Sequence, residues 1–346
     1  MSNTVRRDAS SVEYSGTLAT GGQAPLRAGV VGVGHVGRHH ARILAELPGV
    51  ELVAVADIDA ARARAVADRS GCRAEGRASA LLDDVDAVTV AVPTEAHRDV
   101  AEPFLERGIP VLVEKPIAAS LAEADALIAA ASAAGALLAV GHTERYNPAV
   151  TAARPLITAP RFIEVHRLAQ FPDRSLDVDV VFDVMIHDLD LVLDLCGAAP
   201  AAIEAVGVPV LSERVDIASV RIRFDNGCIA NLTASRISRE RVRKLRFFQK
   251  DALVAIDCAA QQVDAWRVRR SAGSAPAIEG GALHVPPGEP LALELADFVR
   301  AVRSGVRPGV DGHDGRRALA LAQRVAEVME TTDSADAAPH PAPPRD

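Results

Sequence analysis

Residues 26–57 read LRAGVVGVGHVGRHHARILAELPGVELVAVAD. An apolar run enters the glycine pattern GVGHVG at 32–37, and a second apolar run ends on Asp57. Between them, apolar residues recur at helical spacing and Pro48-Gly49 supplies a turn. The pattern therefore predicts a buried strand, a helix and a second buried strand: 26–33, 35–47 and 50–56.

The glycine spacing has a physical meaning at each position. Gly32 permits a tight turn out of the first strand, Gly34 lets a pyrophosphate approach the backbone, and Gly37 lets the helix pack closely on the strand. His35 and Val36 occupy the turn that faces the phosphates. A helix N-terminus at this point offers free N–H groups and a favourable dipole to an anion. The stretch predicts a dinucleotide site.

The acid that ends the second strand indicates which dinucleotide is bound. Asp57 lies about twenty residues beyond the third glycine, where a carboxylate accepts from both ribose hydroxyls. The same carboxylate would repel a 2′-phosphate. We therefore expect NAD rather than NADP.

Length and composition narrow the function classes. The chain has 346 residues, 49% of them apolar, which is enough for two domains with substantial cores. Only 3% are aromatic and the net charge is −8, so a nucleic-acid surface is disfavoured. The four cysteines, Cys72, Cys196, Cys228 and Cys258, form no CxxC pair, which predicts reduced, mostly buried thiols and no zinc ribbon. We expect no metal, since the adjacent His39 and His40 would point about 100° apart on a helix.

Neither end of the chain has a globular pattern. Residues 1–25 lack the apolar segment of a secretory signal, and 332–346 are rich in proline, so we expect two disordered tails. The longest apolar stretch, 127–140, is too short to span a bilayer. These features predict a cytoplasmic protein without a membrane anchor.

The pattern changes near residue 148. Residues 26–148 alternate apolar strands with alanine-rich helices, which predicts a parallel sheet with helical crossovers. Residues 149–331 contain strands of mixed polarity, with Asn226-Gly227 as a hairpin turn, which predicts a mostly antiparallel sheet. The strands expected in the first part are 27–33, 50–56, 86–92, 110–113 and 137–140. Those expected in the second are 161–170, 203–210, 215–224, 228–236, 242–249 and 252–257, with helices at 178–196, 291–304 and 313–330.

Two motifs follow the third and fourth strands, at the edge of the sheet where ligands of such folds bind. In VPTEAH, Pro93 and Thr94 are expected beside the nicotinamide, with His97 close by; the alternative is an ordinary loop in which Thr94 caps a helix. In VEKP, Glu114 and Lys115 end a buried strand immediately before a proline, and both are expected to contact the cofactor. A solvated turn lysine is the alternative to a functional one, and the bond to the proline is a candidate cis peptide.

Asp183 and His187 lie four residues apart in the predicted helix 178–196. At that spacing they share a face, and a carboxylate one turn from an imidazole can orient the ring and raise its basicity, as a general base requires. An exposed ion pair would give the same pattern.

Two further segments are candidates for substrate binding. Residues 142–148, HTERYNP, gather polar side chains after the last strand of the first domain, which predicts substrate contacts from Glu144, Arg145, Tyr146 and Asn147. The run Arg236 to Arg246 is the main basic concentration in the chain. It is either a solvated strand face or a cationic rim for a phosphorylated or nucleotide-linked substrate, whose diphosphate Arg239, Arg241 and Arg243 would hold.

The segments GVGHVG, VADID, AVPTEAH, VEKPIA, GHTERYNPAV and DVMIHDLD, in this order, resemble the Gfo/Idh/MocA oxidoreductase family from roughly Leu26 to Thr331. The resemblance implies a Rossmann domain followed by an α/β domain whose open sheet commonly serves oligomerisation. It also implies that Lys115, Asp183 and His187 line the substrate site beside the nicotinamide.

Within the family, HTERYNPAV, FPDRSLDVDVVFDVMIHDLD and SRISRERVRKLRFFQKDALVAID are similar to the branch that acts on UDP-N-acetylglucosamine in lipid A precursor synthesis. The expected function is NAD-dependent oxidation of a sugar hydroxyl, at C3 of that nucleotide sugar, by a homodimer or homotetramer. His187, oriented by Asp183, would take the proton, Lys115 would stabilise the alkoxide, and Glu114 would position the lysine. Two enzymatic alternatives stay open, a dehydrogenase of a free polyol such as inositol and a reductase using NAD(P)H. A third alternative is a non-catalytic dinucleotide sensor, which would need neither Lys115 nor His187.

Overall fold

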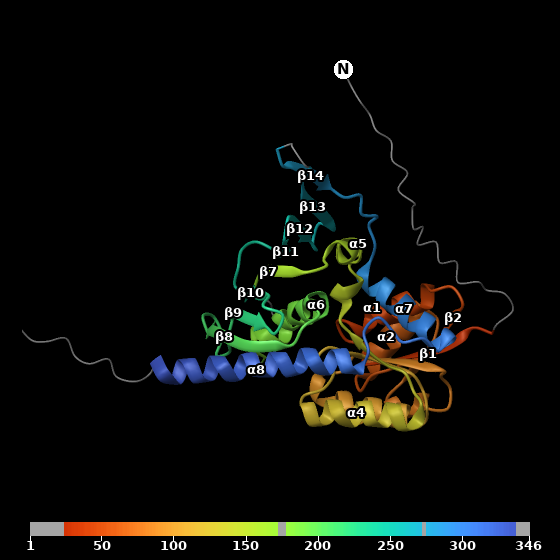
Figure 1. Ribbon diagram of the computed structural model, residues 1–346. Coiled ribbons are helices and arrows are strands. Elements are labelled where there is room, and N and C mark those ends of the chain that lie inside the picture. Colours follow the sequence, from red (N-terminus) through yellow and green to blue (C-terminus); the bar gives the residue numbers. More distant parts are fainter. Residues whose placement is uncertain (1–23, 172–177, 272–274, 337–346) are drawn as a thin grey trace, which may run out of the picture.

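The computed structural model describes residues 24–171, 178–271 and 275–336, which form two sheets and the helices that cover them (Figure 1). The first sheet has six parallel strands in the order β3-β2-β1-β4-β5-β6, the arrangement of a dinucleotide-binding domain. Its strands are β1 (Leu26–Val31), β2 (Val50–Ala56), β3 (Arg73–Glu75), β4 (Ala87–Val90), β5 (Val111–Glu114) and β6 (Leu138–Gly141). The five predicted strands are confirmed, and the short edge strand β3 is additional.

Helices cross between these strands and are capped by the expected residue types. The Asp59 side chain accepts from two backbone N–H groups at the start of α2, and Ser120 accepts from Glu123 N at the start of α4. Gly71 and Gly135 end the same two helices in the left-handed conformation. The helices are α1 (Gly37–Glu46), α2 (Ala60–Ser70), α3 (His97–Glu106) and α4 (Leu121–Ala134), with single turns η1 (Ala78–Leu81) and η2 (Thr94–Ala96).

The second sheet has eight strands in the order β14-β13-β12-β11-β7-β10-β9-β8, antiparallel except for the β7–β10 pair. The predicted Asn226-Gly227 hairpin is confirmed, with Gly227 at φ +80°. The strands are β7 (Pro160–Leu168), β8 (Pro200–Val208), β9 (Ile217–Phe224), β10 (Ile229–Ser235), β11 (Val242–Gln249), β12 (Ala252–Asp257), β13 (Gln262–Arg269) and β14 (Ala277–Ala282). The prediction missed β13 and β14.

The remaining helices join the two sheets. Helix α8 contacts α4 and β6 at one end and α6 and β8 along the rest of its length, so it spans both halves of the molecule (Figure 1). Single turns η3 (Thr143–Tyr146) and η4 (Arg154–Leu156) flank α5 after the first sheet. The helices are α5 (Pro148–Ala153), α6 (Ile186–Cys196), α7 (Pro290–Ser304) and α8 (Gly312–Asp336).

Two predicted boundaries are wrong. Helix α7 was assigned to the second domain, but its Leu295, Phe298 and Val299 are buried with the residues of α1, β1 and β2 in the first core. The apolar face of α7 is thus part of the core of the first domain, although α7 comes after the second sheet in the sequence. Helix α8 continues to Asp336, past the predicted end of the second domain at Thr331. The rest of the predicted tails, 1–23 and 337–346, lies outside the described residues.

The predicted helix over 178–196 has a different geometry at its start. Residues Val181–Met185 form a π-helical turn, η5, and the α-helix begins only at Ile186. In a π-turn the hydrogen bonds run from i to i+5, so residues four apart across this junction do not superpose as they would in an α-helix. This change decides how Asp183 and His187 are placed.

Buried polar groups and thiols complete the framework. Arg236, expected on a solvated face, is 1% exposed and donates from Nε to Asp216 Oδ1 at 2.8 Å. Cys196, Cys228 and Cys258 are buried free thiols and Cys72 is half-buried, as expected. Among the described residues, no helix combines the length and apolarity that crossing a bilayer requires.

Candidate active site

The glycine loop after β1 has the geometry that its sequence predicts. Gly32 adopts φ +81°, and a Cβ placed on Gly37 would lie 1.8 Å from the Gly32 carbonyl oxygen. A Cβ on Gly34 would meet nothing within 4 Å, so the backbone there is open to a ligand. His35 and Val36 are exposed beside it, and α1 begins at Gly37. The loop therefore fits a pyrophosphate at the N-terminus of a helix.

Asp57, at the end of β2, is held against this loop. Its Oδ2 accepts from Val33 N and its Oδ1 from Asp59 N, each at 2.9 Å, and the residue is 7% exposed. Arg62, which the sequence reasoning did not single out, lies with Nη1 3.3 Å from the Asp57 carboxylate. The acid is thus fixed where a ribose would lie, with a guanidinium beside it.

Pro93, Thr94 and Lys115 follow β4 and β5 at the same edge of the sheet, and the Lys115–Pro116 peptide bond is cis, as expected. His97 has a different role from the predicted one. It is 1% exposed, with Nδ1 2.8 Å from Pro116 O and Nε2 3.0 Å from Val92 O. Both ring nitrogens therefore face backbone carbonyl oxygens, and the neutral ring donates its single N–H to one of them. His97 ties the two edge loops together and does not present a group to a cofactor.

Lys115 connects the two halves of the site. Its Nζ donates to the Asp183 carbonyl oxygen at 2.7 Å and lies 3.5 Å from Asp183 Oδ1. The Lys115 side chain is 18% exposed and that of Asp183 is 31% exposed. An ammonium has three N–H donors, so one stays available for a substrate oxygen. The solvated turn lysine is excluded for Lys115.

His187 is partly buried near Lys115, but Asp183 does not orient it. Within the described chain the Nδ1 atom of His187 has no hydrogen-bond partner, because the π-turn aims the Asp183 carboxylate at Lys115 instead. The ring meets His142 edge-on, with centroids 6.1 Å apart. Burial and the positive charges of Lys115 and Arg167 hold the pKa of His187 well below its usual range. The imidazole is therefore neutral at pH 7 and able to accept a proton.

The Glu114 carboxylate binds the backbone N–H of Lys115. Its Oε2 accepts from Lys115 N at 3.2 Å, and its Oε1 lies 3.1 Å from His40 Nε2. Burial would raise the pKa of Glu114, but the His40 hydrogen bond and the Lys115 charge lower it. His40 is fully buried, and the sequence reasoning did not identify it as a partner of Glu114. Glu114 is thus a support for Lys115.

A second buried acid lies close by. Glu294 of α7 is 1% exposed, and its Oε2 accepts from the Thr143 hydroxyl at 3.1 Å. Burial and the charge of Glu114 raise the pKa of Glu294 well above its usual range. The sequence reasoning missed this residue, since it lies on the apolar face of a helix assigned to another domain. Two acids with oppositely shifted pKa values therefore lie beneath the site.

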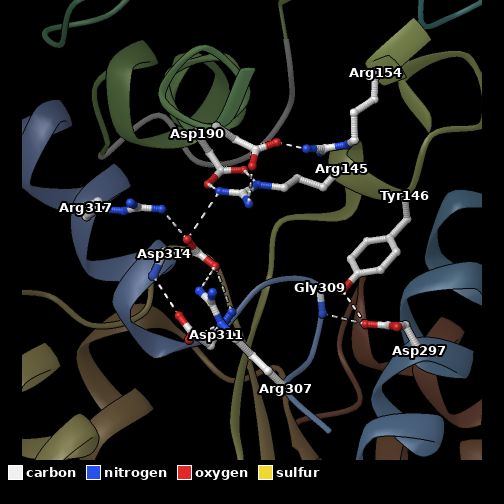
Figure 2. Close-up of polar contacts among 11 residues, drawn as sticks. Arg145, Tyr146, Arg154, Asp190, Asp297, Arg307, Gly309, Asp311, Asp314 and Arg317 are labelled. Carbon is white, nitrogen blue, oxygen red and sulfur yellow. Dashed lines mark hydrogen bonds and ion pairs between the residues drawn. The ribbon is translucent and has the colours of Figure 1, made fainter. Parts of the chain in front are cut away.

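Arg145 is not placed to contact substrate (Figure 2). Its Nε and Nη2 each lie 2.6 Å from a carboxylate oxygen of Asp190, and Nη1 lies 3.1 Å from Asp194 Oδ1. Nη2 is also 3.8 Å from Asp314 Oδ1. The side chain is 7% exposed and Asp190 is fully buried. Arg145 is a buried clamp between the first domain, the helix that carries His187, and α8.

The other residues of this predicted substrate segment are also structural. The Tyr146 hydroxyl donates to Asp297 Oδ2 at 2.9 Å (Figure 2), and Asn147 caps α5 while donating to Cys258 O at 3.0 Å. Glu144 Oε1 accepts from Arg167 Nη1 at 3.1 Å and from Arg243 Nη1 at 3.2 Å. Polar side chains gathered here because the segment joins the two domains.

Of the basic run, Arg243 contacts the segment that joins the domains, with Nη1 3.2 Å from Glu144 Oε1. Arg239 and Arg241 are exposed between β10 and β11, and within the described ranges no contact joins their side chains to Lys115 or His187. Arg243 is one of the cations that lower the pKa of His187. Across the described residues no group of three or more His, Cys, Asp or Glu side chains is arranged to hold a metal ion.

Comparison with known proteins agrees with this geometry. Residues 26–142 match the model of the oxidoreductase family with an NAD-binding Rossmann fold, and 157–252 match the GFO/IDH/MocA C-terminal domain. The chain is also 41% identical over 309 residues to the UDP-N-acetylglucosamine 3-dehydrogenase of Acidithiobacillus ferrooxidans, covering 88% of this chain and 97% of the relative. The chain belongs to the Gfo/Idh/MocA oxidoreductase family.

Two further similarities place the chain within this NAD-binding family. The solved structure of the same Acidithiobacillus enzyme, GnnA, superposes with a TM-score of 0.84 at 39% identity, covering 89% of this chain and 99% of that one. The inositol 2-dehydrogenase of Rhizobium meliloti is 27% identical, covering 86% and 94% of the two chains. The family, the fold and the assignment as a dehydrogenase are thereby established.

Proposed function

We propose that the protein oxidises the C3 hydroxyl of UDP-N-acetylglucosamine to a ketone with NAD⁺. The observation that carries the proposal is the contact of Lys115 Nζ with Asp183, which brings a cation and the neutral His187 together at the carboxyl edge of the nucleotide-binding sheet. The similarity to a UDP-N-acetylglucosamine 3-dehydrogenase over nearly the full length of both chains supports the substrate.

Lys115 acts on the oxygen that is oxidised. Asp183 fixes two of the three N–H donors of its ammonium, so the third is aimed at a bound hydroxyl. As the hydroxyl loses its proton, the ammonium stabilises the developing negative charge. Asp183 is therefore a positioning residue for Lys115.

His187 takes the hydroxyl proton. Its lowered pKa keeps the imidazole unprotonated at neutral pH, and its unpartnered Nδ1 leaves the ring able to turn toward the substrate. The C3–H bond breaks with its electron pair while the O–H proton passes to His187, and C3 becomes a carbonyl carbon. The chemistry that bound NAD⁺ supplies is acceptance of that hydride.

The residues present fit NAD⁺. The open backbone at Gly34 and the start of α1 would hold the pyrophosphate, and Asp57 would accept from the ribose hydroxyls. Arg62 beside Asp57 is the residue type that accommodates a 2′-phosphate, so the preference for NAD over NADP rests on the fixed carboxylate.

We further propose that the protein is a homodimer joined through the second sheet. On the face opposite α6 and α8, register pairs place five apolar side chains in one row across five strands, and two of these, Phe162 and Phe248, stack at 5.5 Å. Trp266 in this row is 42% exposed. A row of this kind is typical of a surface that a second copy covers. The row comprises Ile229, Phe162, Phe248, Leu253 and Trp266.

The substrate is tested by incubating the protein with NAD⁺ and a panel of UDP-sugars and free polyols, and following the absorbance of NADH. Signal with UDP-N-acetylglucosamine is expected. Signal only with inositol or another polyol would replace the proposed substrate, and binding of NAD⁺ without oxidation of any compound would support a sensor.

The dimer is tested by light scattering. The wild type should have the mass of a dimer, and Trp266→Lys should have the mass of a monomer. A monomeric wild type, or an unchanged dimer in the variant, would contradict the interface.

A further inference from the structure

Two arginines on neighbouring strands bind the same oxygen of Glu144, but they differ in how many of their guanidinium nitrogens are bound to the protein. Arg167 and Arg243 are register partners in the β7–β11 pair. Arg167 is 6% exposed, and its Nε and Nη2 bind Asp188 at 2.7 and 2.8 Å while its Nη1 binds Glu144. Each of the three guanidinium nitrogens of Arg167 is therefore bound to a buried carboxylate of the protein.

Arg243 uses only one of its donors. Its Nη1 lies 3.2 Å from Glu144 Oε1, its side chain is 53% exposed, and its other guanidinium N–H groups meet no partner among the described residues. If Arg243 left Glu144, that carboxylate would keep Arg167 Nη1 at 3.1 Å and Asn147 Nδ2 at 3.4 Å. Arg243 can therefore exchange partners without leaving a buried charge unpaired.

Arg243 is also connected, through its register partner Arg167, to the helix that carries His187. The Asp188 carboxylate, which binds Arg167, belongs to the residue that follows His187 in α6. The positive charge of Arg243 contributes to the lowered pKa of His187. Neither property is seen for Arg239 or Arg241. A cation at this place lies beside the strand residue whose guanidinium binds the helix that carries His187.

We propose that Arg243 binds the diphosphate of the nucleotide sugar, with Glu144 holding the guanidinium in place in the free enzyme. This inference rests on the proposed function, because it takes C3 as the reacting carbon. In UDP-N-acetylglucosamine the diphosphate is attached at C1, which only C2 separates from C3. A planar guanidinium with free N–H groups binds phosphate oxygens in pairs, so Arg243 makes the site selective for phosphorylated sugars over free ones.

The test compares Arg243→Met with wild type, using UDP-N-acetylglucosamine, free N-acetylglucosamine, and UDP as a competitive inhibitor. The variant should raise KM for the nucleotide sugar and the inhibition constant of UDP by about tenfold to a hundredfold, as expected for the loss of charge-assisted hydrogen bonds. Its kcat/KM for the free sugar should fall far less than that for the nucleotide sugar, because the loss of the Arg243 charge acts there only through the pKa of His187. Arg269→Met is the matched control, since Arg269 also pairs with a single glutamate, Glu279, but lies exposed on β13. That control should match wild type throughout.

The outcomes separate this inference from the proposed function. A wild-type KM for UDP-N-acetylglucosamine in Arg243→Met would overturn the role of Arg243 while leaving the function intact. If the wild type oxidises no UDP-sugar, calorimetric binding of UDP decides: weaker binding in the variant supports the anion site, and equal or absent binding overturns it. NAD⁺ affinity checks folding. Should Arg243→Met lose NAD⁺ binding, Arg243→Lys, which keeps the charge but loses the fork, is expected to raise KM several-fold, and an unchanged KM there would also overturn the inference.

Discussion

Replacing Arg145 by methionine should destabilise the protein strongly. The guanidinium is 7% exposed and lies among three carboxylates, making two contacts of 2.6 Å to Asp190, one of 3.1 Å to Asp194 and one of 3.8 Å to Asp314 (Figure 2). Methionine keeps much of the volume of the side chain but supplies no charge and no donor. The three acids would then depend on their other partners.

Most of the loss of stability in Arg145→Met should come from Asp190. Asp194 keeps Arg154 at 2.5 Å, and Asp314 keeps Arg307 at 3.0 Å. Asp190 is fully buried, and the ring of His142, whose Nδ1 lies 4.0 Å away, is kept neutral by burial and does not replace the lost charge. Removing one partner of a buried ion pair leaves an uncompensated charge, which costs about 3–5 kcal/mol. Arg145→Met should therefore lower the free energy of unfolding by that amount.

The assay is urea unfolding followed by circular dichroism, with two companions. The double variant Arg145→Met/Asp190→Leu removes both charges, so it should recover at least half of the loss, since a buried pair replaced by apolar residues is often close to neutral. Arg317→Met removes a 59% exposed partner of Asp314 and should cost less than about 1 kcal/mol. A loss below about 1 kcal/mol in Arg145→Met, or a double variant no more stable than the single one, would refute the assignment of Arg145 as a buried clamp.

Three further predictions concern catalysis, pH and the cofactor. Lys115→Met and His187→Gln should each lower kcat by about a hundredfold or more, with NAD⁺ affinity unchanged in a fluorescence titration, whereas near-normal turnover in either would remove that residue from the mechanism. Burial lowers the pKa values of His97, His142 and His187 in the folded protein below the ordinary 6.5, so the unfolded chain binds more protons in acid. Stability is therefore fully present above about pH 6.5 and should fall as the pH drops below it, by up to about 1.4 kcal/mol per pH unit for each histidine; denaturation curves independent of pH in that range would contradict the neutral, buried state. Asp57→Ser should raise KM for NAD⁺ and lower KM for NADP⁺, because Arg62 would face the 2′-phosphate without the carboxylate, and an unchanged ratio of the two KM values would exclude Asp57 as the discriminating residue.

The nucleotide half of the site was predictable because its constraints are local. Gly32, Gly37 and Asp57 lie within one strand–helix–strand unit, and each residue type is required by the backbone geometry of that unit. Lys115 was also predictable, since a lysine that ends a buried strand before a proline has few structural explanations. Features that depend only on residues close together in the sequence can therefore be predicted from the sequence.

The junction between the domains was not predictable because its partners are distant in sequence. The segment that holds Arg145 looked like a substrate surface, yet Asp190 and Asp314 lie 45 and 169 positions further along the chain. Strands β13 and β14, the last two at one end of the second sheet, were missed because they are largely exposed and lack a clear alternation of apolar residues. The π-turn before α6 has no sequence pattern that distinguishes it from an α-helix, so the pairing of Asp183 with Lys115 emerged only in three dimensions.

The most direct test of the central claim is the initial rate of NADH formation by the full-length protein with NAD⁺ and UDP-N-acetylglucosamine, with the sugar product identified by mass spectrometry. The account predicts NADH and an equimolar 3-keto nucleotide sugar that has lost two hydrogens. The absence of both with UDP-N-acetylglucosamine, together with NADH formation from a free polyol, would contradict it.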